Sequence, residues 1–364
     1  MKLKISKNDF VVCIFFFLIS LCKGIGLGNS SSIYFIIYLM GILVASIKLF
    51  KVGFNKKELI NIAIIIILGI LDYIFGNEST ILFTAISILF LKNIECDKII
   101  KALFLGRLFG FVFMIILPCL GLMDMNTISF YRASAGGSII RYAFGYSHPN
   151  YAHSSLNLII IMYIYLYFER LNVKKIVFLE LVNYIFYNYT YSRTGFLILT
   201  LFLLLSLFTK YSSKVKNSMP KILNFTFIFS ILISFLMGLL YGKVEILNKI
   251  NEILTGRLSY MNIVLKGYMP QLIKTHQFIN VLFDNGYFDL LYNGGILASI
   301  WFVVMQIKTN LYIKENKMYR EALLTNIFFI YCITESYYVS SVMNISLLFF
   351  AMCIFKRKSL LNNK

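Results

Sequence analysis

The sequence predicts an all-α, multi-pass membrane protein. Of its 364 residues, 59% are hydrophobic and only 14% are charged, and the mean hydropathy of +0.78 lies far above the range of soluble domains. Apolar runs long enough to cross a bilayer recur along the whole sequence. One globular core cannot bury this much apolar surface, so the composition excludes a soluble enzyme or a soluble binding protein.

About twelve apolar segments are predicted to be transmembrane helices. The first follows a basic stretch and has no small-residue cleavage site after it, so we interpret it as a retained helix rather than a signal peptide. No soluble domain interrupts the series, and we expect one integral membrane domain over residues 1–364. The predicted spans are 10–22, 33–50, 59–75, 80–92, 99–122, 151–168, 175–190, 194–209, 222–241, 287–307, 322–340 and 342–355.

The basic residues indicate how this bundle is oriented. The net charge of +19 comes mostly from short lysine clusters between apolar runs, such as those at 56–57 and 174–175. Membrane proteins fix their topology in this way, whereas a nucleic-acid-binding protein would gather the charge on one surface. We therefore expect cytoplasmic N- and C-termini, no nucleic-acid partner, and two longer extracellular loops at 123–150 and 242–286.

Arginines occur on the predicted outer face, where the topology does not require them. Arg132 and Arg141 lie in the first long loop, Arg193 lies between two spans, and Arg257 lies in the second long loop. A guanidinium group binds phosphate in a bidentate geometry that lysine cannot reproduce. These positions predict anion binding, although an arginine such as Arg193 can also reach lipid phosphates from a helix end.

The stretch from Met123 to His153, which runs from the first outer loop into the next span, carries two of the three histidines of the chain. Pro149 disfavours helix at His148, and Asn150 is a good N-cap for the span that follows. The positive end of that helix would then lie beside His148 and His153, which favours an anion site. The alternative for His153 is an interfacial histidine without a ligand. Without a nearby carboxylate, the two histidines do not indicate a metal site.

The second outer loop offers a candidate general base. Asp284 lies where the loop returns to the membrane, and His276 precedes it. A carboxylate there could accept the proton of a sugar hydroxyl, although Asp-Asn-Gly is also a common turn sequence. Within the same loop, apolar residues recur at helical spacing between Val244 and Leu254. This pattern predicts an amphipathic helix on the membrane surface.

Asp72, Glu180 and Glu335 lie in or near predicted spans, where ionisable groups are costly and often functional. Because of these residues, transport stays an alternative function. The sequence has no motif for ATP, for a nucleotide sugar or for zinc, and its six cysteines form no disulfide framework. We therefore expect no cofactor and no metal. A reaction at the outer face would then need a substrate that is already activated, such as a lipid-linked pyrophosphate.

Four segments together resemble a known family. They are RASAGGSIIRYAFGYSHPNYAH, YSRTGF, TGR and DNGYFDLLYNGG. In this order they resemble the Wzy-type polysaccharide repeat-unit polymerases of Gram-positive capsule and exopolysaccharide loci, which belong to the O-antigen polymerase and ligase superfamily. The resemblance covers about residues 123–300. It implies a glycosyltransferase of the bacterial cytoplasmic membrane that polymerises undecaprenyl-pyrophosphate-linked oligosaccharides by metal-independent, inverting transfer at the outer face.

The resemblance also implies roles for individual residues. The group that binds pyrophosphate would be Arg132, Arg141, Arg193, Arg257, His153 and Asn150, and the catalytic group would be Asp284, His276 and His148. Ligases of the superfamily place a histidine base just before the returning span. Here Asp284 holds about that position, so we rank Asp284 above His276 as the base.

The partners implied are the lipid-linked oligosaccharide and the bilayer, with chain-length regulator and flippase proteins as further candidates. Two alternatives stay open at this point. One is a flippase or transporter of lipid-linked oligosaccharide, and the other is a polysaccharide ligase of the same superfamily.

Overall fold

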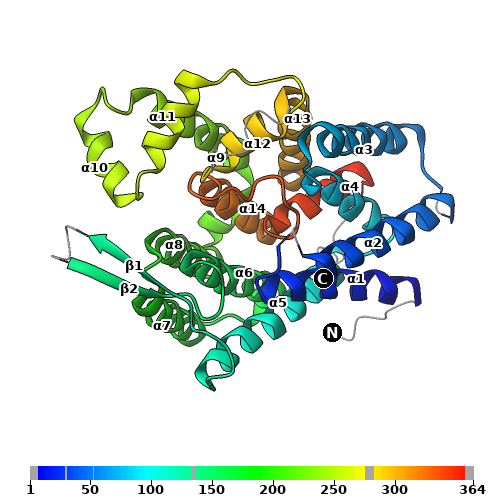
Figure 1. The fold of residues 1–364 in the computed structure, drawn as a ribbon. Helices are drawn as coiled ribbons and strands as arrows, with labels where there is room; N and C mark the ends of the chain where they lie inside the picture. Colours follow the sequence, from blue (N-terminus) through cyan, green and yellow to red (C-terminus); the bar gives the residue numbers. More distant parts are fainter. Residues whose placement is uncertain (1–6, 29–30, 52, 133–136, 275–282, 357–364) are drawn as a thin grey trace. The chain divides into compact units, whose positions relative to one another are not determined.

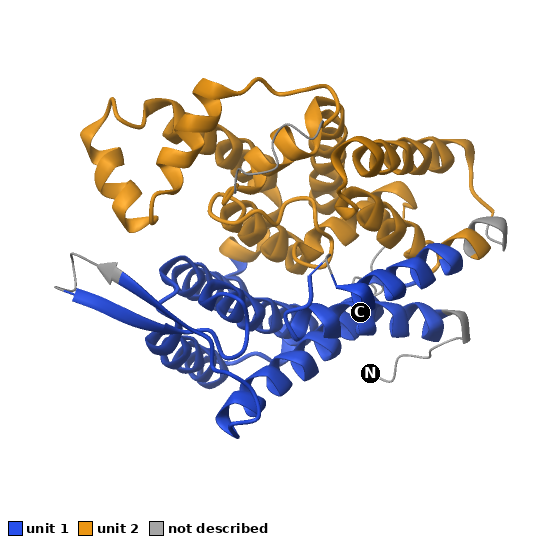
Figure 2. Cartoon of the chain, in the orientation of Figure 1, with its two compact units in different colours: residues 1–44, 94–213 blue, residues 45–93, 214–364 orange. Residues whose placement is uncertain are grey.

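A computed structural model describes residues 7–28, 31–51, 53–132, 137–274 and 283–356 of the chain (Figure 1). Within these ranges the backbone forms helices α1 to α15, two 3-10 turns and one β-hairpin. The predicted all-α class is therefore confirmed apart from the hairpin. The contacts divide the chain into two compact units, each assembled from two separate stretches: unit 1 is 1–44 and 94–213, and unit 2 is 45–93 and 214–364 (Figure 2).

Unit 1 is a helical assembly in which α1 packs along α5, and α6 packs against α5, α7 and α8. Glycine sets the closest approach. A Cβ placed on Gly110 of α5 would lie 2.7 Å from the carbonyl oxygen of Leu21 in α1, so only a hydrogen fits there. The helices of this unit are α1 (Lys7–Gly24), most of α2 (Ser32–Lys51), α5 (Cys96–Cys119), α6 (Pro149–Tyr167), η2 (Phe168–Arg170), α7 (Val173–Thr190) and α8 (Arg193–Tyr211).

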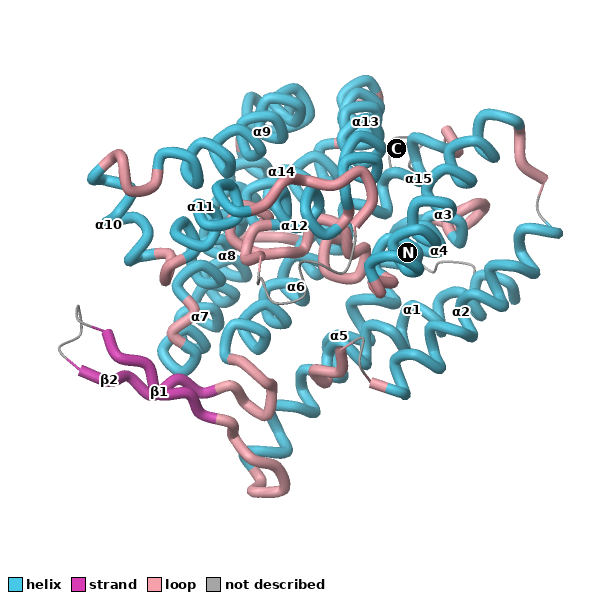
Figure 3. Tube along the Cα trace, turned by 45° about the horizontal axis from the view of Figure 1, so that its top comes forward, coloured by secondary structure: helices cyan, strands magenta, loops and turns pink. Residues whose placement is uncertain are grey.

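The first predicted outer loop contains a β-hairpin (Figure 3). Strand β1 (Thr127–Arg132) pairs antiparallel with β2 (Gly137–Tyr142), in a register that sets Thr127 opposite Tyr142 and Arg132 opposite Gly137. The sequence analysis treated this stretch only as a loop. Its β-branched and aromatic residues favour extended backbone, which accounts for the strands. The hairpin lies beside α7, which β2 contacts.

Unit 2 is built around α13, which packs against α3, α12, α14 and α15. The start of α3 is fixed by a capping box: the Asn55 side chain accepts from the Glu58 amide, and the Glu58 carboxylate accepts from the Asn55 amide. The elements of this unit are α3 (Lys56–Gly76), α4 (Thr80–Phe90), α9 (Ser213–Leu240), α10 (Glu245–Ile253), α11 (Arg257–Gly267), α12 (Gly286–Asn293), α13 (Gly295–Glu315), α14 (Tyr319–Tyr331), η4 (Ile345–Phe349) and α15 (Phe350–Ile354).

Helix α4 is almost entirely buried, and its polar side chains bond to an irregular segment that follows α14. The Thr84 hydroxyl donates to the Val339 carbonyl at 2.7 Å, and the Ser341 hydroxyl donates to that of Ser87 at 3.0 Å. The predicted span at 322–340 differs from this structure, because α14 ends at Tyr331 and the chain continues without regular helix to η4. Hydroxyls of α4 replace part of the hydrogen bonding that a continuous helix would provide.

Six helices in the described residues are long and apolar enough to cross a membrane, which supports a multi-pass membrane protein. They are Lys56–Gly76, Cys96–Cys119, Pro149–Arg170, Arg193–Tyr211, Ser213–Leu240 and Gly295–Glu315. The count of about twelve spans and the orientation stay predictions. One predicted span, 287–307, is broken between α12 and α13, where Gly295 has a φ of 81° that favours glycine.

The amphipathic helix predicted between Val244 and Leu254 is confirmed as α10. Leu247 is buried on its inner side, while Ile246 and Ile253 are exposed. Exposed apolar side chains next to Lys249 and Glu252 are typical of a helix at a membrane surface. Helix α11, which packs against α10, was not predicted.

Candidate functional site

In unit 1, the turn before α6 places two of the predicted site residues together. His148 has an extended backbone, Pro149 is the first helical residue, and the His148 Nδ1 atom accepts from the Asn150 amide at 3.1 Å. The N-cap is thus His148 rather than Asn150, which corrects the predicted cap. Proline suits the first helical position because it has no amide hydrogen to satisfy, and an imidazole nitrogen can accept where an Asn oxygen usually does.

Arg141 is anchored by Asn150, whose side chain does not cap α6. Its Nη2 atom donates to the Asn150 side-chain oxygen at 2.6 Å, and its Nε atom donates to the Thr190 carbonyl at 2.8 Å. The side chain is only 7% exposed. Strand β2, the start of α6 and the end of α7 therefore meet at one guanidinium group. Both of these acceptors are neutral oxygens, so they orient the group without cancelling its positive charge.

His153 lies deeper, fully buried between α6 and α7. Its Nδ1 atom lies 2.9 Å from the Thr190 hydroxyl and its Nε2 atom lies 3.0 Å from the Asn183 side-chain oxygen. With both ring nitrogens occupied, the geometry favours a positioning role for His153 over direct contact with an anion. Thr190 joins the two predicted residues, because its carbonyl binds Arg141 and its hydroxyl binds His153.

The polar contacts continue from His153 along α7 and to α8. Asn183 donates to a carboxylate oxygen of Glu180 at 3.3 Å, and the Thr200 hydroxyl donates to the other oxygen at 2.7 Å. Glu180, the acidic residue weighed in the sequence for a transporter, is thus half-buried and bonded to two neutral side chains. This arrangement satisfies a carboxylate inside an apolar unit without a counter-charge among these contacts.

The YSRTGF segment forms the turn between α7 and α8. Tyr191 takes the left-handed conformation with φ 46°, and α8 begins at Arg193, so the predicted position of this arginine at a helix N-terminus is confirmed. Ser192 is the N-cap residue but makes no side-chain capping bond. Arg193 is half-buried. A cation at this end of a helix is unfavourable to the helix itself.

Two predicted residues cannot be placed. Arg132 is the last residue of β1, and its side chain lies outside the described part of the structure. His276 falls in the segment 275–282, which also lies outside the described residues.

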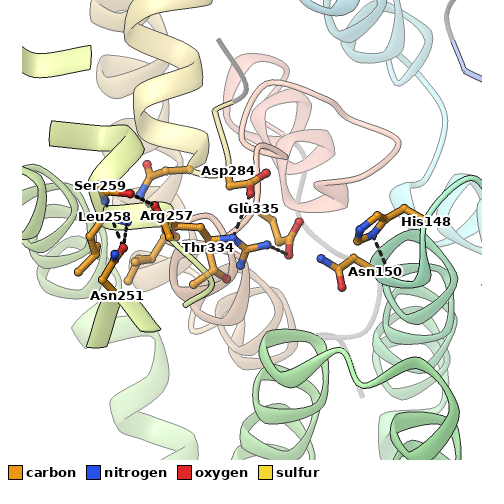
Figure 4. A network of polar contacts seen from close by, with 12 residues as sticks. His148, Asn150, Asn251, Arg257, Leu258, Ser259, Asp284, Thr334 and Glu335 are labelled. Atoms are coloured by element: carbon orange, nitrogen blue, oxygen red, sulfur yellow. Dashed lines mark hydrogen bonds and ion pairs between the residues drawn. The ribbon is translucent and has the colours of Figure 1, made fainter. Parts of the chain in front are cut away.

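In unit 2, Arg257 is held between two carboxylates (Figure 4). Its Nε atom donates to Asp284 Oδ2 at 3.2 Å, and its Nη2 atom donates to Glu335 Oε1 at 3.1 Å. Arg257 is 5% exposed, whereas the Asp284 side chain is 54% exposed. Burial alone lowers the pKa of the Arg257 guanidinium, but Glu335 and Asp284 outweigh burial and raise that pKa above its ordinary value. Arg257 therefore stays charged and orients both acids.

The local fold fixes Arg257 at the start of α11. Thr255 and Gly256 turn the chain after α10 with φ of 55° and 88°. The Asn251 side chain then accepts from the Leu258 and Ser259 amides at 2.9 and 3.2 Å, as seen in Figure 4. An asparagine from the preceding helix thus satisfies amides that the first turn of α11 leaves open.

Asp284 is positioned by the residue that follows it. The Asn285 side chain accepts from the Tyr287 and Phe288 amides at 2.9 and 3.1 Å and caps α12. Its amide group also donates to the Ser234 hydroxyl at 2.9 Å and to the Ile333 carbonyl at 2.8 Å. Asn285 is 1% exposed and fully bonded, so the backbone next to the half-exposed Asp284 is rigid.

Glu335 is the member of this cluster that the sequence analysis did not place in the site. It was noted there only as an ionisable residue near a span. Because a buried carboxylate requires a counter-charge, a search for cations on the predicted outer face would have found Arg257 as a candidate partner.

Chemically, the cluster presents an exposed carboxylate held by a buried arginine. The Asp284 oxygens can accept a proton or hydrogen bonds from a hydroxyl group, and the Arg257 ion pair fixes their direction. A small pocket beside them is lined by Arg257, Tyr260, Met261, Val264, Phe283, Asp284, Asn285 and Phe288.

Comparison with known proteins adds no relative to this picture. No family model matches the chain, and neither a curated protein nor a solved structure matches it. The candidate residues that the structure describes therefore rest on the geometry given above.

Proposed function

We propose that the protein is a glycosyltransferase that polymerises undecaprenyl-pyrophosphate-linked oligosaccharide units. The observation that carries this proposal is the half-exposed Asp284, which is held by the buried Arg257, itself paired with Glu335. A protein with so few charged residues has placed an organised acid–base group in a loop between membrane helices. Such a group suits activation of a sugar hydroxyl.

In the proposed reaction, the acceptor hydroxyl gives its proton to Asp284 while its oxygen forms a bond to the anomeric carbon of the donor. The bond from that carbon to the pyrophosphate oxygen breaks, and undecaprenyl pyrophosphate leaves with the electron pair. Attack opposite the leaving group inverts the configuration. His276 is the second candidate for the base, and His148 is a further candidate catalytic residue.

The anionic leaving group needs cations, and we assign this role to the arginines. Arg141, oriented by Asn150 and Thr190, and Arg193, at the start of α8, are the two best supported in unit 1. Hydrogen-bond donors that are already oriented stabilise the charge that develops on pyrophosphate. Arg132 is proposed for the same role on its sequence position. Arg257 is proposed to orient Asp284 through their ion pair.

The proposal includes a location. The protein would lie in the bacterial cytoplasmic membrane with about twelve spans and both termini in the cytoplasm, so that the loops 123–150 and 242–286 face outside. The bilayer itself and flippase or chain-length proteins would be its neighbours. The lipid-linked donor already carries its leaving group, so the proposed reaction takes neither a nucleotide nor a metal cofactor.

The test is reconstitution of the purified protein in liposomes with lipid-linked repeat units. A gel ladder of repeat-unit multiples, formed without nucleotide or metal, would support polymerisation. Transfer of one finished chain to a different acceptor, without a ladder, would identify a ligase instead.

A flippase is the second candidate, because unit 1 contains the half-buried carboxylate of Glu180 with its bonded neighbours. In the same liposomes a flippase would move lipid-linked units across the bilayer unchanged. That activity would depend on Glu180 rather than on Asp284. Movement without polymer would overturn the glycosyltransferase proposal.

A further inference from the structure

Unit 2 contains a second polar pocket that the proposed reaction does not use. It is a cavity of about 60 Å³ where the end of α3, the start of α4 and α12 meet. Its polar lining consists of Asp72, Glu78, Thr80, Asp289 and Asn293. Three of these five side chains are carboxylic acids, in a protein whose net charge is +19.

One acid of this pocket is buried without a hydrogen-bond partner. Asp72 is 3% exposed, and its Oδ1 atom has no partner among the described residues. By contrast, Asp289 Oδ1 accepts from the Asn293 amide group at 2.8 Å. An unpartnered carboxylate oxygen that lines a cavity is costly unless a ligand in the cavity donates to it.

A buried lysine pairs with one of the three acids. Lys274 is 8% exposed in its side chain, and its Nζ atom lies 3.5 Å from Glu78 Oε1. The backbone before it is fixed to α13, because the Ile296 and Leu297 amides donate to the Gln271 and Leu272 carbonyls. Lys274 therefore brings one ammonium group to the edge of the pocket and leaves the charge of the acids incompletely balanced.

A glycine beside Asp72 makes room for the Lys274 side chain. A Cβ placed on Gly76 would lie 3.0 Å from Asp72 Oδ1 and 2.7 Å from Lys274 Cδ. The Lys274 stem thus passes over Gly76 toward Glu78, close to the buried Oδ1 atom of Asp72, a residue that lines the cavity.

The size and charge of the pocket select the class of ligand. Within the described residues no group of three or more His, Cys, Asp or Glu side chains is arranged to hold a metal ion. A primary ammonium group is small, positively charged and carries three hydrogen-bond donors, which match oxygen acceptors on several sides. We propose that this pocket binds a primary ammonium group of an incoming ligand, with Asp72 as its main partner.

Two sources can supply this group, an amino sugar or the ethanolamine headgroup of a lipid. Binding of an ammonium group in this pocket does not depend on polymerisation. An experiment can therefore overturn this proposal and leave the proposed glycosyltransferase function untouched, or the reverse. Full-length protein is placed in phosphatidylcholine nanodiscs, in which the lipid carries no primary amine and no sugar detergent is present. It is titrated with glucosamine and with N-acetylglucosamine. Saturation-transfer NMR reports binding. We expect a signal for glucosamine and none for N-acetylglucosamine, in which the amine is acylated.

Substitution locates the binding. Asp72→Asn keeps the size of the side chain and is expected to weaken glucosamine binding about tenfold or more, because a hydrogen bond to a charged group is lost. Glu245→Gln, which removes an exposed carboxylate of α10, is the matched control and should bind as the wild type does. Size-exclusion chromatography in the nanodisc checks that both variants are folded.

The lipid source is tested by exchanging phosphatidylcholine for phosphatidylethanolamine and measuring the melting temperature. A rise that Asp72→Asn abolishes would assign the pocket to the lipid headgroup. Equal binding of glucosamine and N-acetylglucosamine by the wild type would overturn the proposal whether or not the variants fold. The same follows if neither glucosamine nor phosphatidylethanolamine distinguishes wild type from Asp72→Asn.

Discussion

Gly195 in the first turn of α8 lies directly against the imidazole ring of His153 in α6. A Cβ on Gly195 would be 2.9 Å from His153 Cδ2. The ring cannot retreat, because Thr190 and Asn183 bind its two nitrogens. In addition, the Asn157 side chain donates to the Gly195 carbonyl at 2.9 Å. The histidine that follows the HPN sequence, His153, thus packs directly against the glycine of the SRTG sequence, Gly195.

This contact makes Gly195→Ala a sensitive substitution. We expect a loss of about 1–3 kcal/mol in the free energy of unfolding, because the added methyl group overpacks a buried ring that is fixed by hydrogen bonds. Gly28→Ala is the control, since a Cβ there meets nothing within 4 Å. Thermal unfolding in the same nanodiscs compares the two. Equal melting temperatures would show that the α6–α8 contact can relax.

Arg193→Lys tests the anion-binding role separately from the fold. The side chain is half-buried at the start of α8, and lysine keeps its charge but loses the two parallel hydrogen bonds that guanidinium makes to phosphate. We expect most of the polymerising activity to disappear while the melting temperature stays within about 1 °C. Lys266→Arg in α11 is a reverse control that should change neither quantity. Normal polymer from Arg193→Lys would remove this residue from the proposed site.

Asp284→Asn tests the base. The side chain is 54% exposed, so the substitution should leave the fold intact. Loss of a general base should slow the liposome reaction by about 10²–10⁴-fold. Asp124→Asn, an exposed acid of the first predicted outer loop, serves as the control. If Asp284→Asn retains full activity, His276→Gln becomes the next variant to measure.

Glu335→Gln tests the buried ion pair. Its carboxylate is 10% exposed and Arg257 is 5% exposed, so removal of one charge should cost about 3 kcal/mol of stability. A matched double variant, Arg257→Met with Glu335→Leu, should recover much of that stability because no buried charge is left. It should not recover polymerisation, since Asp284 loses the group that orients it. Restored activity in the double variant would contradict the positioning role of Arg257.

The local features of this fold were the most predictable from sequence. The amphipathic pattern after Val244 predicted α10, and the proline of SHPN predicted the start of α6. The identity of the cap was missed by two residues, because His148 and Asn150 can both accept a backbone hydrogen bond. The difference changes the contacts of Arg141, since a capping Asn150 would not be available to it.

Long-range pairs were the least predictable. Arg257 and Glu335 are 78 residues apart, and no local pattern says which buried acid a given arginine will meet. The pocket of Asp72 and Asp289 joins α3 to α12 in the same way. Hydropathy also predicted too much regular helix after Tyr331. It reports how apolar a segment is, and the apolar, buried segment there has an irregular backbone.

The bonds between α4 and the segment after α14 also determine when unit 2 can be completed during synthesis. The Thr84 hydroxyl donates to the carbonyl of Val339, which lies 255 residues later in the chain. Until the ribosome has delivered that partner, α4 must keep its hydroxyls bonded within its own turn, as Ser87 does to the Phe83 carbonyl. Unit 2 therefore reaches its final packing only after Val339 has been synthesised, and a chain truncated before Val339 would expose an unfinished helix to the insertion and quality-control machinery.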